Sequence, residues 1–258
     1  MALQKGVIDG VITRTTSEAA QFQDLGHSIN TIDLDGSSSG GLTYTGSSDA
    51  EAIDGTSSAD TVSLDDGDDT FTTNGGSDIV DGGTGFDTVV VSSTRSQTSA
   101  KSDNDGSFTV TVNGDLLDLT NVERLQLTDG TIALDLDGAA GQTYRLYQSA
   151  FNRTPDDAGL SHNVNLMDGG LSIFDMANAF IQSAEFQQTY GASIDDATFI
   201  TLLYNNVLNR APDDAGLAGW QDSLNGGSTR AEVLFGFSES GENKANVAAA
   251  IDDGIWLV

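Results

Sequence analysis

A repeat of nine residues is the feature that most constrains the fold of this chain. Residues 46–90 divide into five consecutive nonapeptides, GSSDAEAID, GTSSADTVS, LDDGDDTFT, TNGGSDIVD and GGTGFDTVV, with an acid always in sixth place. The eighth residue is always apolar: Ile53, Val62, Phe71, Val80 and Val89. A flexible linker rich in Gly, Asp and Ser has no reason to keep an apolar residue at every ninth place. The repeat therefore predicts an ordered structure.

The pattern fits a coil of a parallel β-helix, in which each nonapeptide supplies a tight turn of roughly five or six residues and then a short strand. Glycine supplies the positive φ angles and the exposed carbonyl groups that the turn requires. The apolar eighth residue is expected to point inward and to stack on its equivalents in neighbouring coils. The acid in sixth place is expected to point at the neighbouring turn.

Successive turns alternate between two edges, so turns on one edge lie eighteen residues apart. This spacing puts Glu51, Asp69 and Asp87 on one edge, and Asp60 and Asp78 on the other. Stacked carboxylates need a cation between them, and carboxylates with turn carbonyls supply the hard oxygen ligands that calcium takes, whereas magnesium demands stricter octahedral geometry. We therefore predict a calcium-binding roll. Its candidate metal-site residues are Glu51, Asp60, Asp66, Gly67, Asp69, Gly76, Asp78, Gly83, Gly85 and Asp87.

The charge of the chain agrees with a cation requirement. Lys and Arg total 10, Asp and Glu total 39, and the net charge is −29. This charge repels phosphate backbones and anionic lipid surfaces, so nucleic acid is excluded as a partner. It also opposes compaction unless divalent cations neutralise it. Cysteine is absent and only His27 and His162 are available as imidazole ligands, which excludes disulfides and thiolate zinc sites.

No catalytic constellation is visible in the sequence. The two histidines form no HExxH motif, and about 45 residues outside the repeats and helices are too few for a usual catalytic domain. The segment GSSSG at 36–40 matches the GxSxG elbow of serine hydrolases, but a second glycine follows where that elbow requires a helix. We therefore expect a protein that is not an enzyme.

The segments that flank the repeats have less regular patterns. We expect residues 1–45 to form an arm that caps the roll or takes part in assembly, with a short helix in SEAAQFQDL, and residues 94–106 to form a loop. Residues 107–119 and 122–136 alternate around Asn-Gly and Asp-Gly, which predicts two hairpins that cap the roll within a domain spanning 46–136. No cleavable signal and no segment of membrane-spanning length is expected.

A second repeat, with an offset of 57 residues, occupies the C-terminal part. LYQSAFNRTPDDAGL (146–160) recurs as LYNNVLNRAPDDAGL (203–217). Apolar spacing predicts helices, arranged as repeats of about 144–200 and 201–257 within a domain spanning 137–258. Each Pro-Asp-Asp sequence favours capping of the next helix, with a calcium loop as the alternative. Arg153 and Arg210 lie at equivalent helix ends, where a structural role is expected.

Two family resemblances follow from these motifs. The nonapeptides, most closely at 73–90, resemble the RTX repeats of bacterial proteins exported by type I secretion, although Asp49 and Ser58 replace the fourth-position glycine in the first two copies. Residues 135–258, through RTPDDAGL, RAPDDAGL, SAEF and GFSES, resemble a tandem helical family, domain of unknown function 4214. The last residues, IDDGIWLV, look like a C-terminal export signal, or alternatively a segment that packs on the helices.

These resemblances imply an α+β protein with a calcium-bound parallel β-roll and a tandem α-helical domain, secreted from a Gram-negative bacterium to the cell surface or beyond. Our leading expectation is a structural protein that calcium folds and that self-assembles into a surface layer (S-layer), filament or biofilm matrix. The alternative is an adhesin-like module that binds a cell-surface glycan or a partner protein through the helical tandem. Its aromatic contacts would be Tyr190, Trp220 and Trp256, although core packing explains each of them better.

Overall fold

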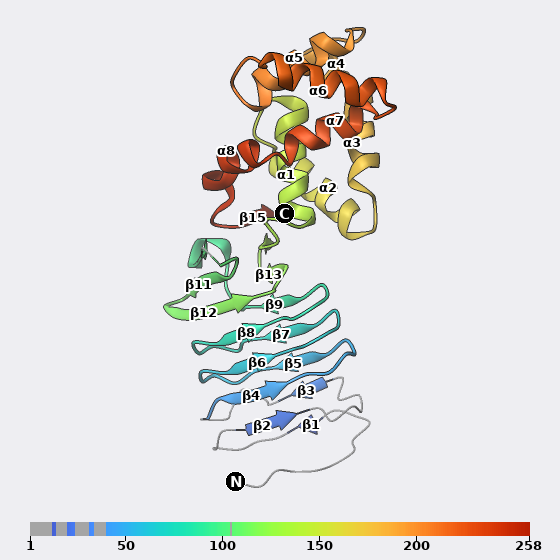
Figure 1. Ribbon diagram of the computed structural model, residues 1–258. Coiled ribbons are helices and arrows are strands. Elements are labelled where there is room, and N and C mark those ends of the chain that lie inside the picture. Colours follow the sequence, from blue (N-terminus) through green and yellow to red (C-terminus); the bar gives the residue numbers. More distant parts are fainter. Residues whose placement is uncertain (1–11, 14–19, 24–30, 34–39, 104) are drawn as a thin grey trace. The chain divides into compact units, whose positions relative to one another are not determined.

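The computed structural model describes residues 12–13, 20–23, 31–33, 40–103 and 105–258 (Figure 1). They divide into two compact units. The first unit holds the described residues up to Asp135 together with 253–256 and Val258, and the second holds Leu136–Asp252 and Leu257. The first is built of strands and the second of helices, which confirms the predicted α+β class.

The β unit contains two sheets whose strands lie in successive coils of one roll, as Figure 1 shows for β5 to β9. The eight-stranded sheet has the order β1 (Ile12–Thr13), β3 (Thr31–Asp33), β5 (Ala52–Asp54), β7 (Thr70–Thr72), β9 (Thr88–Val90), β13 (Arg124–Gln126), β14 (Thr131–Ala133), β15 (Ile255–Leu257). The seven-stranded sheet has the order β10 (Thr98–Ser102), β11 (Phe108–Val112), β12 (Asp115–Thr120), β8 (Ile79–Asp81), β6 (Thr61–Ser63), β4 (Leu42–Thr45), β2 (Ala20–Gln23).

The core of the roll consists of the apolar eighth residues that the nonapeptides predict. In the eight-stranded sheet Ile53, Phe71 and Val89 pair in parallel register and are at most 1% exposed. Leu125 of β13 continues this ladder after Val89. In the other sheet the equivalent ladder is Tyr44, Val62, Val80 and Leu119. Each of the three-residue strands β5 to β9 has one buried position, so each repeat contributes one inward-pointing strand residue to the core.

The roll begins N-terminal to the expected boundary at residue 46. Strands β1 to β4 pair in parallel with one another and with β5 and β6. The expected helix around SEAAQFQDL is therefore wrong where the structure describes it, because Ala20–Gln23 is the strand β2, paired with β4. Residues 1–11, 14–19, 24–30 and 34–39, with most of GSSSG and His27, lie outside the described residues; strand β4, and no helix, follows that motif.

Two antiparallel hairpins follow the last repeat, as predicted. The first joins β11 to β12 through Asn113-Gly114, both with positive φ, and the second joins β13 to β14. Residues 94–106, expected as a loop, contain the 3-10 helix η1 (Arg95–Gln97) and β10, which pairs with β11. In β10 the small residues Thr98 and Ala100 are buried, so a strand forms there without a strong apolar alternation.

The C-terminal strand β15 differs from the expected packing on helices. It is the hydrogen-bonded neighbour of β14, and Ile255 is only 3% exposed. Arg95 contributes to this placement, because its guanidinium contacts Asp253 at 3.4 Å and lies 6.0 Å from the Trp256 ring. Residues 253–256 therefore belong to the β unit, although the expected helical domain ran to residue 258.

The helical unit consists of two four-helix repeats related by 57 residues. The first repeat contains α1 (Ala139–Phe151), α2 (Asp157–Asp168), α3 (Ile173–Gln182) and α4 (Ala184–Tyr190). The second contains α5 (Asp196–Val207), α6 (Asp214–Asn225), α7 (Arg230–Ser238) and α8 (Gly241–Ile251). One aromatic and aliphatic core, including Phe180, Phe199 and Phe237, is shared by both repeats. Within the described residues, no helix has the length and apolar character needed to cross a membrane.

Candidate metal-binding turns of the β-roll

The sixth-position acids form two hydrogen-bonded ladders along the edges of the roll. On one edge the backbone N–H of Glu51 donates to Asp69 Oδ1 at 2.7 Å, and that of Asp69 donates to Asp87 Oδ1 at 2.9 Å. On the other edge Asp60 N–H donates to Asp78 Oδ1 at 2.9 Å. Each acid thus contacts the turn eighteen residues earlier, which is the geometry that the repeat predicts.

The two ladders end differently. On the second edge the residue eighteen positions before Asp60 is Leu42, whose backbone N–H donates to Asp60 Oδ1. At this end of the ladder an apolar residue therefore stands where the repeats have an acid. Beyond Asp78 the register of β12 with β8 places Leu117, which is 2% exposed, next in line. On the first edge Glu123 follows Asp87, because Asp87 N–H donates to Glu123 Oε2 at 2.7 Å. Sequence reasoning missed Glu123, which lies outside the nonapeptides but 36 residues, a multiple of the nine-residue period, after Asp87.

Burial of these carboxylates is nearly complete. Glu51 is 3% exposed, Asp60, Asp69 and Asp78 are each 1% exposed, and Asp87 is fully buried. The Oδ2 atoms of Asp69, Asp78 and Asp87 are buried and have no hydrogen-bond partner among the described residues. A buried anionic oxygen without a partner is costly unless a cation or a proton neutralises it. These turns therefore require a positive charge that the described side chains do not supply to those oxygens.

The raised pKa values of these acids likewise indicate that their carboxylates need a positive charge nearby. Burial, followed by the charges of Asp60 and Asp115, raises the pKa of Asp78 to about 7. Burial, followed by the charges of Asp69, Glu123 and Asp68, raises the pKa of Asp87 to about 7. Burial also raises the pKa of Asp69 and of Glu123. In each case hydrogen bonds from backbone N–H groups act in the opposite direction, but desolvation outweighs them.

The glycines of the turns allow backbone carbonyl groups to approach closely. At Gly83, which has a φ of +94°, an added Cβ would lie only 1.8 Å from the carbonyl oxygen of Asp65. Only glycine, which has no Cβ, can adopt such a φ angle and also allow a carbonyl oxygen to come this close. All four predicted glycines share the placement over the carbonyl oxygen eighteen residues earlier: Gly67 over Asp49, Gly76 over Ser58, Gly83 over Asp65 and Gly85 over Gly67.

Asp66 differs from the other predicted acids. It is exposed and forms a bridge with Thr84 of the next coil, whose hydroxyl donates to Asp66 Oδ1. Asp68 has a similar contact, since it accepts a hydrogen bond of 2.9 Å from the backbone N–H of Phe86. Both residues thus contact the next turn from the outside, whereas the sixth-position acids contact the preceding turn from within.

The donor set of the turns suits a hard divalent cation such as calcium. It consists of carboxylate oxygens and the carbonyl oxygens that the glycines bring close, with no imidazole or thiolate. Among the residues that the structure describes, three or more acidic, His or Cys side chains do not converge on one point. A cation in these turns would therefore depend on backbone carbonyls for much of its coordination.

The acids of the helical unit are neutralised in other ways. Asp156 and Asp213 each cap the following helix by accepting the N–H of Gly159 and Gly216, at 2.9 and 2.8 Å. Capping, the favoured interpretation of Pro-Asp-Asp, is thus confirmed. The predicted helix-end arginines are structural: Arg153 pairs with Glu185 at 2.6 Å, and Arg210 pairs with Glu242 at 2.8 Å.

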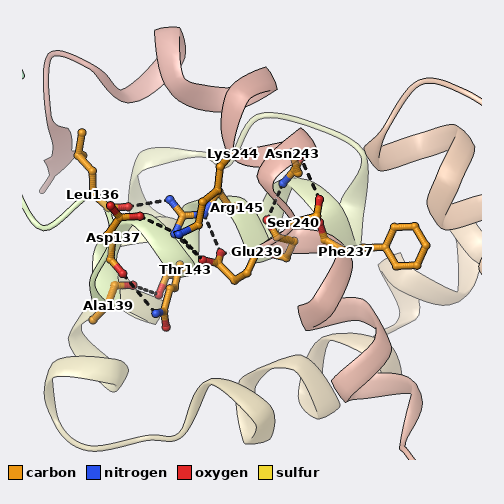
Figure 2. Close-up of polar contacts among 12 residues, drawn as sticks. Leu136, Asp137, Ala139, Thr143, Arg145, Phe237, Glu239, Ser240, Asn243 and Lys244 are labelled. Atoms are coloured by element: carbon orange, nitrogen blue, oxygen red, sulfur yellow. Dashed lines mark hydrogen bonds and ion pairs between the residues drawn. The ribbon is translucent and has the colours of Figure 1, made fainter. Parts of the chain in front are cut away.

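One polar network joins the start of α1 to the junction of α7 and α8 (Figure 2). The guanidinium of Arg145 donates two hydrogen bonds of 2.7 Å to the Glu239 carboxylate and a third to the carbonyl of Leu136. Lys244 bridges Asp137 at 2.7 Å and Glu239 at 3.5 Å. Arg145 is 2% exposed, so a buried, bidentate ion pair connects α1 to the junction between α7 and α8.

The aromatic residues considered for glycan contact have structural surroundings. Tyr190 is 2% exposed, and its hydroxyl donates to the carbonyl of Ser149 at 2.6 Å. Trp220 is half-buried and stacks on Phe237 with ring centroids 5.0 Å apart. Trp256 is half-buried in strand β15 of the β unit. Core packing therefore accounts for Tyr190 and Trp220.

Comparisons with known proteins characterise mainly the helical part. Among solved structures, the extracellular lipase LipA from Serratia marcescens aligns with 37% of this chain and only 16% of the lipase chain, at 24% identity and a TM-score of 0.32. That similarity is too low to support a functional assignment. No curated protein matches the chain. Residues 177–247, fewer than the resemblance suggested, match the family described as a domain of unknown function (DUF4214). This part of the helical unit is therefore similar to DUF4214 domains.

Proposed function

We propose that this chain is a secreted structural protein whose β-roll folds when calcium binds between its turns. The observation that carries the proposal is the pair of buried acid ladders, in which Asp69, Asp78 and Asp87 each keep a carboxylate oxygen without a partner among the described residues. Residues 46–91 contain eleven acids and neither Lys nor Arg, so the repeats offer no internal counter-charge. A calcium ion supplies that charge and accepts the oxygen donors present.

Calcium binding and folding are coupled in this proposal. Each candidate site requires two turns from successive coils on the same edge, and these turns come together only in the folded roll. The free energy of binding therefore becomes free energy of folding. Extracellular calcium modules bind with dissociation constants of about 10⁻⁴ to 10⁻³ M, so such a roll folds outside the cell and stays loose where free calcium is scarce. This behaviour suits export by type I secretion, which the RTX-like repeats suggest.

We further propose that the folded chain assembles with copies of itself into a surface layer, filament or matrix and has no catalytic role. Support comes from the exposed apolar pair Ile79 and Leu116, 54% and 53% exposed, on the neighbouring strands β8 and β12. The glycan-binding alternative has less support, because Tyr190 and Trp220 pack within the helical core.

Electron microscopy and light scattering of the purified chain test this proposal. With millimolar calcium we expect polymers or sheets that dissolve when excess chelator is added. Ile79→Ser with Leu116→Ser should reduce assembly but leave calcium binding unchanged, and Leu166→Ser, at an apolar residue 41% exposed on α2, serves as the matched control. A calcium-bound monomer at all concentrations would overturn the assembly role, and a chain that binds no calcium would overturn the whole proposal.

A further inference from the structure

A stacked turn outside the nonapeptides follows the last repeat. On the edge of Asp69 and Asp87, the last repeat turn (82–87) is followed by the short connection 121–123 between β12 and β13. The connection is fixed in register at both ends, because Thr120 pairs with Asp81 and Arg124 pairs with Thr88. Residues 121–123 therefore occupy the position of the next turn.

The backbone of this connection reproduces the contacts of a repeat turn. Gly82 N–H donates to the carbonyl of Thr120 at 2.9 Å, as Gly46 N–H donates to the carbonyl of Ser63 at 2.8 Å. The Glu123 carboxylate accepts the N–H of Asp87, as the repeat acids accept the N–H groups of the turns before them. Glu123 thus takes the place of a sixth-position acid in a segment with a different sequence.

The carbonyl group of Asn121 completes the likeness. A Cβ added at Gly82 would lie 2.0 Å from Asn121 O and 2.7 Å from Asp87 Oδ2. At Gly46 the equivalent distances are 2.1 Å to Leu64 O and 2.6 Å to Glu51 Oε2. In both turns a glycine leaves open a space that a carbonyl oxygen and a carboxylate oxygen both approach. Asn121, with a φ of +52°, turns the chain sharply enough to place its carbonyl there.

An independent observation indicates that a ligand belongs in this space. Asp87 is fully buried, and its Oδ2 atom has no hydrogen-bond partner among the described residues. The nearby Arg124 guanidinium donates instead to the carbonyl of Glu123 at 2.7 Å and to Asp135 at 2.6 Å, and it lies over the Phe86 ring. The orphaned oxygen is one of the two atoms that approach the space at Gly82.

We propose that Asp87, Glu123 and the carbonyl of Asn121 hold an additional calcium ion between the last repeat turn and the capping hairpins. The inference rests on the proposed calcium-dependent folding and extends it beyond the repeats. The ion would stabilise the pairing of β13 with β9. Because β14 and β15 follow β13 in the same sheet, the ion also stabilises the position of the C-terminal strand.

Glu123→Gln in the full chain tests this site, because glutamine keeps an oxygen that accepts the Asp87 N–H but removes the charge. Native mass spectrometry and calorimetric titration with calcium alone should show one ion fewer than in the wild-type chain, or one site weakened at least tenfold. Hydrogen exchange in calcium should accelerate at Leu125 and Gln126 of β13, while β5 to β8 stay protected. Asp118→Asn, at an exposed acid on β12, is the matched control and should change neither quantity.

The outcomes separate this inference from the proposal beneath it. If Glu123→Gln binds the same number of ions with unchanged affinity, the added site is refuted and the repeat sites stand. If Asp118→Asn causes an equal loss, the effect is general electrostatics, and the site is again refuted. If the wild-type chain binds no calcium, the proposed function itself fails.

Discussion

The two units of this protein are both rich in acids but neutralise them by opposite means. In the helical unit, acids cap helices or pair with arginines, as Asp156, Glu185 and Glu239 do. In the roll, the sixth-position acids are buried in ladders, and the Oδ2 atoms of Asp69, Asp78 and Asp87 have no hydrogen-bond partner among the described residues. These acids of the helical unit therefore have partners within the protein, whereas in our proposal the buried acids of the roll obtain their counter-charge from solution. The difference predicts that the helical unit folds without calcium and that the roll folds only when calcium binds.

The largest effect of a single substitution is expected at the buried ion pair of the helical unit. Arg145→Met leaves the Glu239 carboxylate, whose side chain is 14% exposed, without its bidentate partner. Breaking such a pair costs about 3–5 kcal/mol in free energy of unfolding. Thermal and urea unfolding of the helical unit should show this loss equally in calcium and in chelator. Arg230→Met, which removes a more exposed pair with Asp196, should cost at most about 1 kcal/mol.

The pH dependence of stability should have opposite signs in the two units. In chelator, raised pKa values mean that the native roll holds protons which the unfolded chain has lost, so its stability falls as the pH rises from about 4 to about 7. In the helical unit, capping and ion pairs lower the pKa of Asp156, Asp195 and Glu242 in the folded state. The stability that these carboxylates contribute is therefore lost as the pH falls through their lowered pKa values. Urea unfolding at several pH values measures both trends.

Calcium should reverse the trend of the roll, because the ion displaces protons from the same carboxylates and binds more tightly as the pH rises. In millimolar calcium the roll should therefore be more stable at pH 7 than at pH 5. A roll whose stability in chelator increases over this interval would contradict the assignment of Asp78 and Asp87 as buried, metal-requiring acids.

Asp69→Asn should change the stability of the roll in opposite directions with and without calcium. In calcium the variant loses a charged ligand, and we expect at least a tenfold weaker midpoint of calcium-induced folding, about 1.4 kcal/mol. In chelator the variant removes a buried anion and should be more stable than the wild type. Calcium titration followed by circular dichroism measures the midpoint. Asp49→Asn, at an exposed acid in the first repeat, provides the comparison.

The smallest expected effect concerns helix capping. Asp213→Ala removes the side chain that accepts the Gly216 N–H at the start of α6. Loss of such a cap typically costs about 1 kcal/mol. The melting temperature of the helical unit should fall by the same amount in calcium and in chelator. A dependence of this effect on calcium would favour the alternative of a calcium loop at Pro-Asp-Asp.

The sequence predicts the roll best where its period is strict. Residues 46–90 repeat every nine residues, and the structure places the five apolar eighth residues inside and stacks the sixth-position acids as expected. The earlier coils escape detection because their paired residues are farther apart: Ile12 pairs with Ile32, Thr31 with Ala52, and Ala20 with Leu42. Longer turns change the spacing without changing the fold.

Contacts across long sequence separations were the part that the pattern could not predict. Glu123 enters the ladder only because β12 and β13 pair with β8 and β9 after an inserted hairpin. The position of β15 beside β14 likewise depends on a strand edge formed more than a hundred residues earlier. By contrast, the caps Asp156 and Asp213 and the ion pairs of Arg153 and Arg210 are encoded locally by the 57-residue repeat, and their structural role was predicted from it.

Hydrogen exchange of the full chain in calcium and in excess chelator, read out residue by residue, tests the difference between the two units most directly. We predict that above pH 7, where the buried acids of the roll lose their protons, the amides of Ile53, Phe71 and Val89 are protected in calcium and exchange freely in chelator. The amides of Leu203 and Leu234 in the helical core should remain protected in both. Equal protection of the roll amides in the two buffers would contradict the dependence of the roll on calcium.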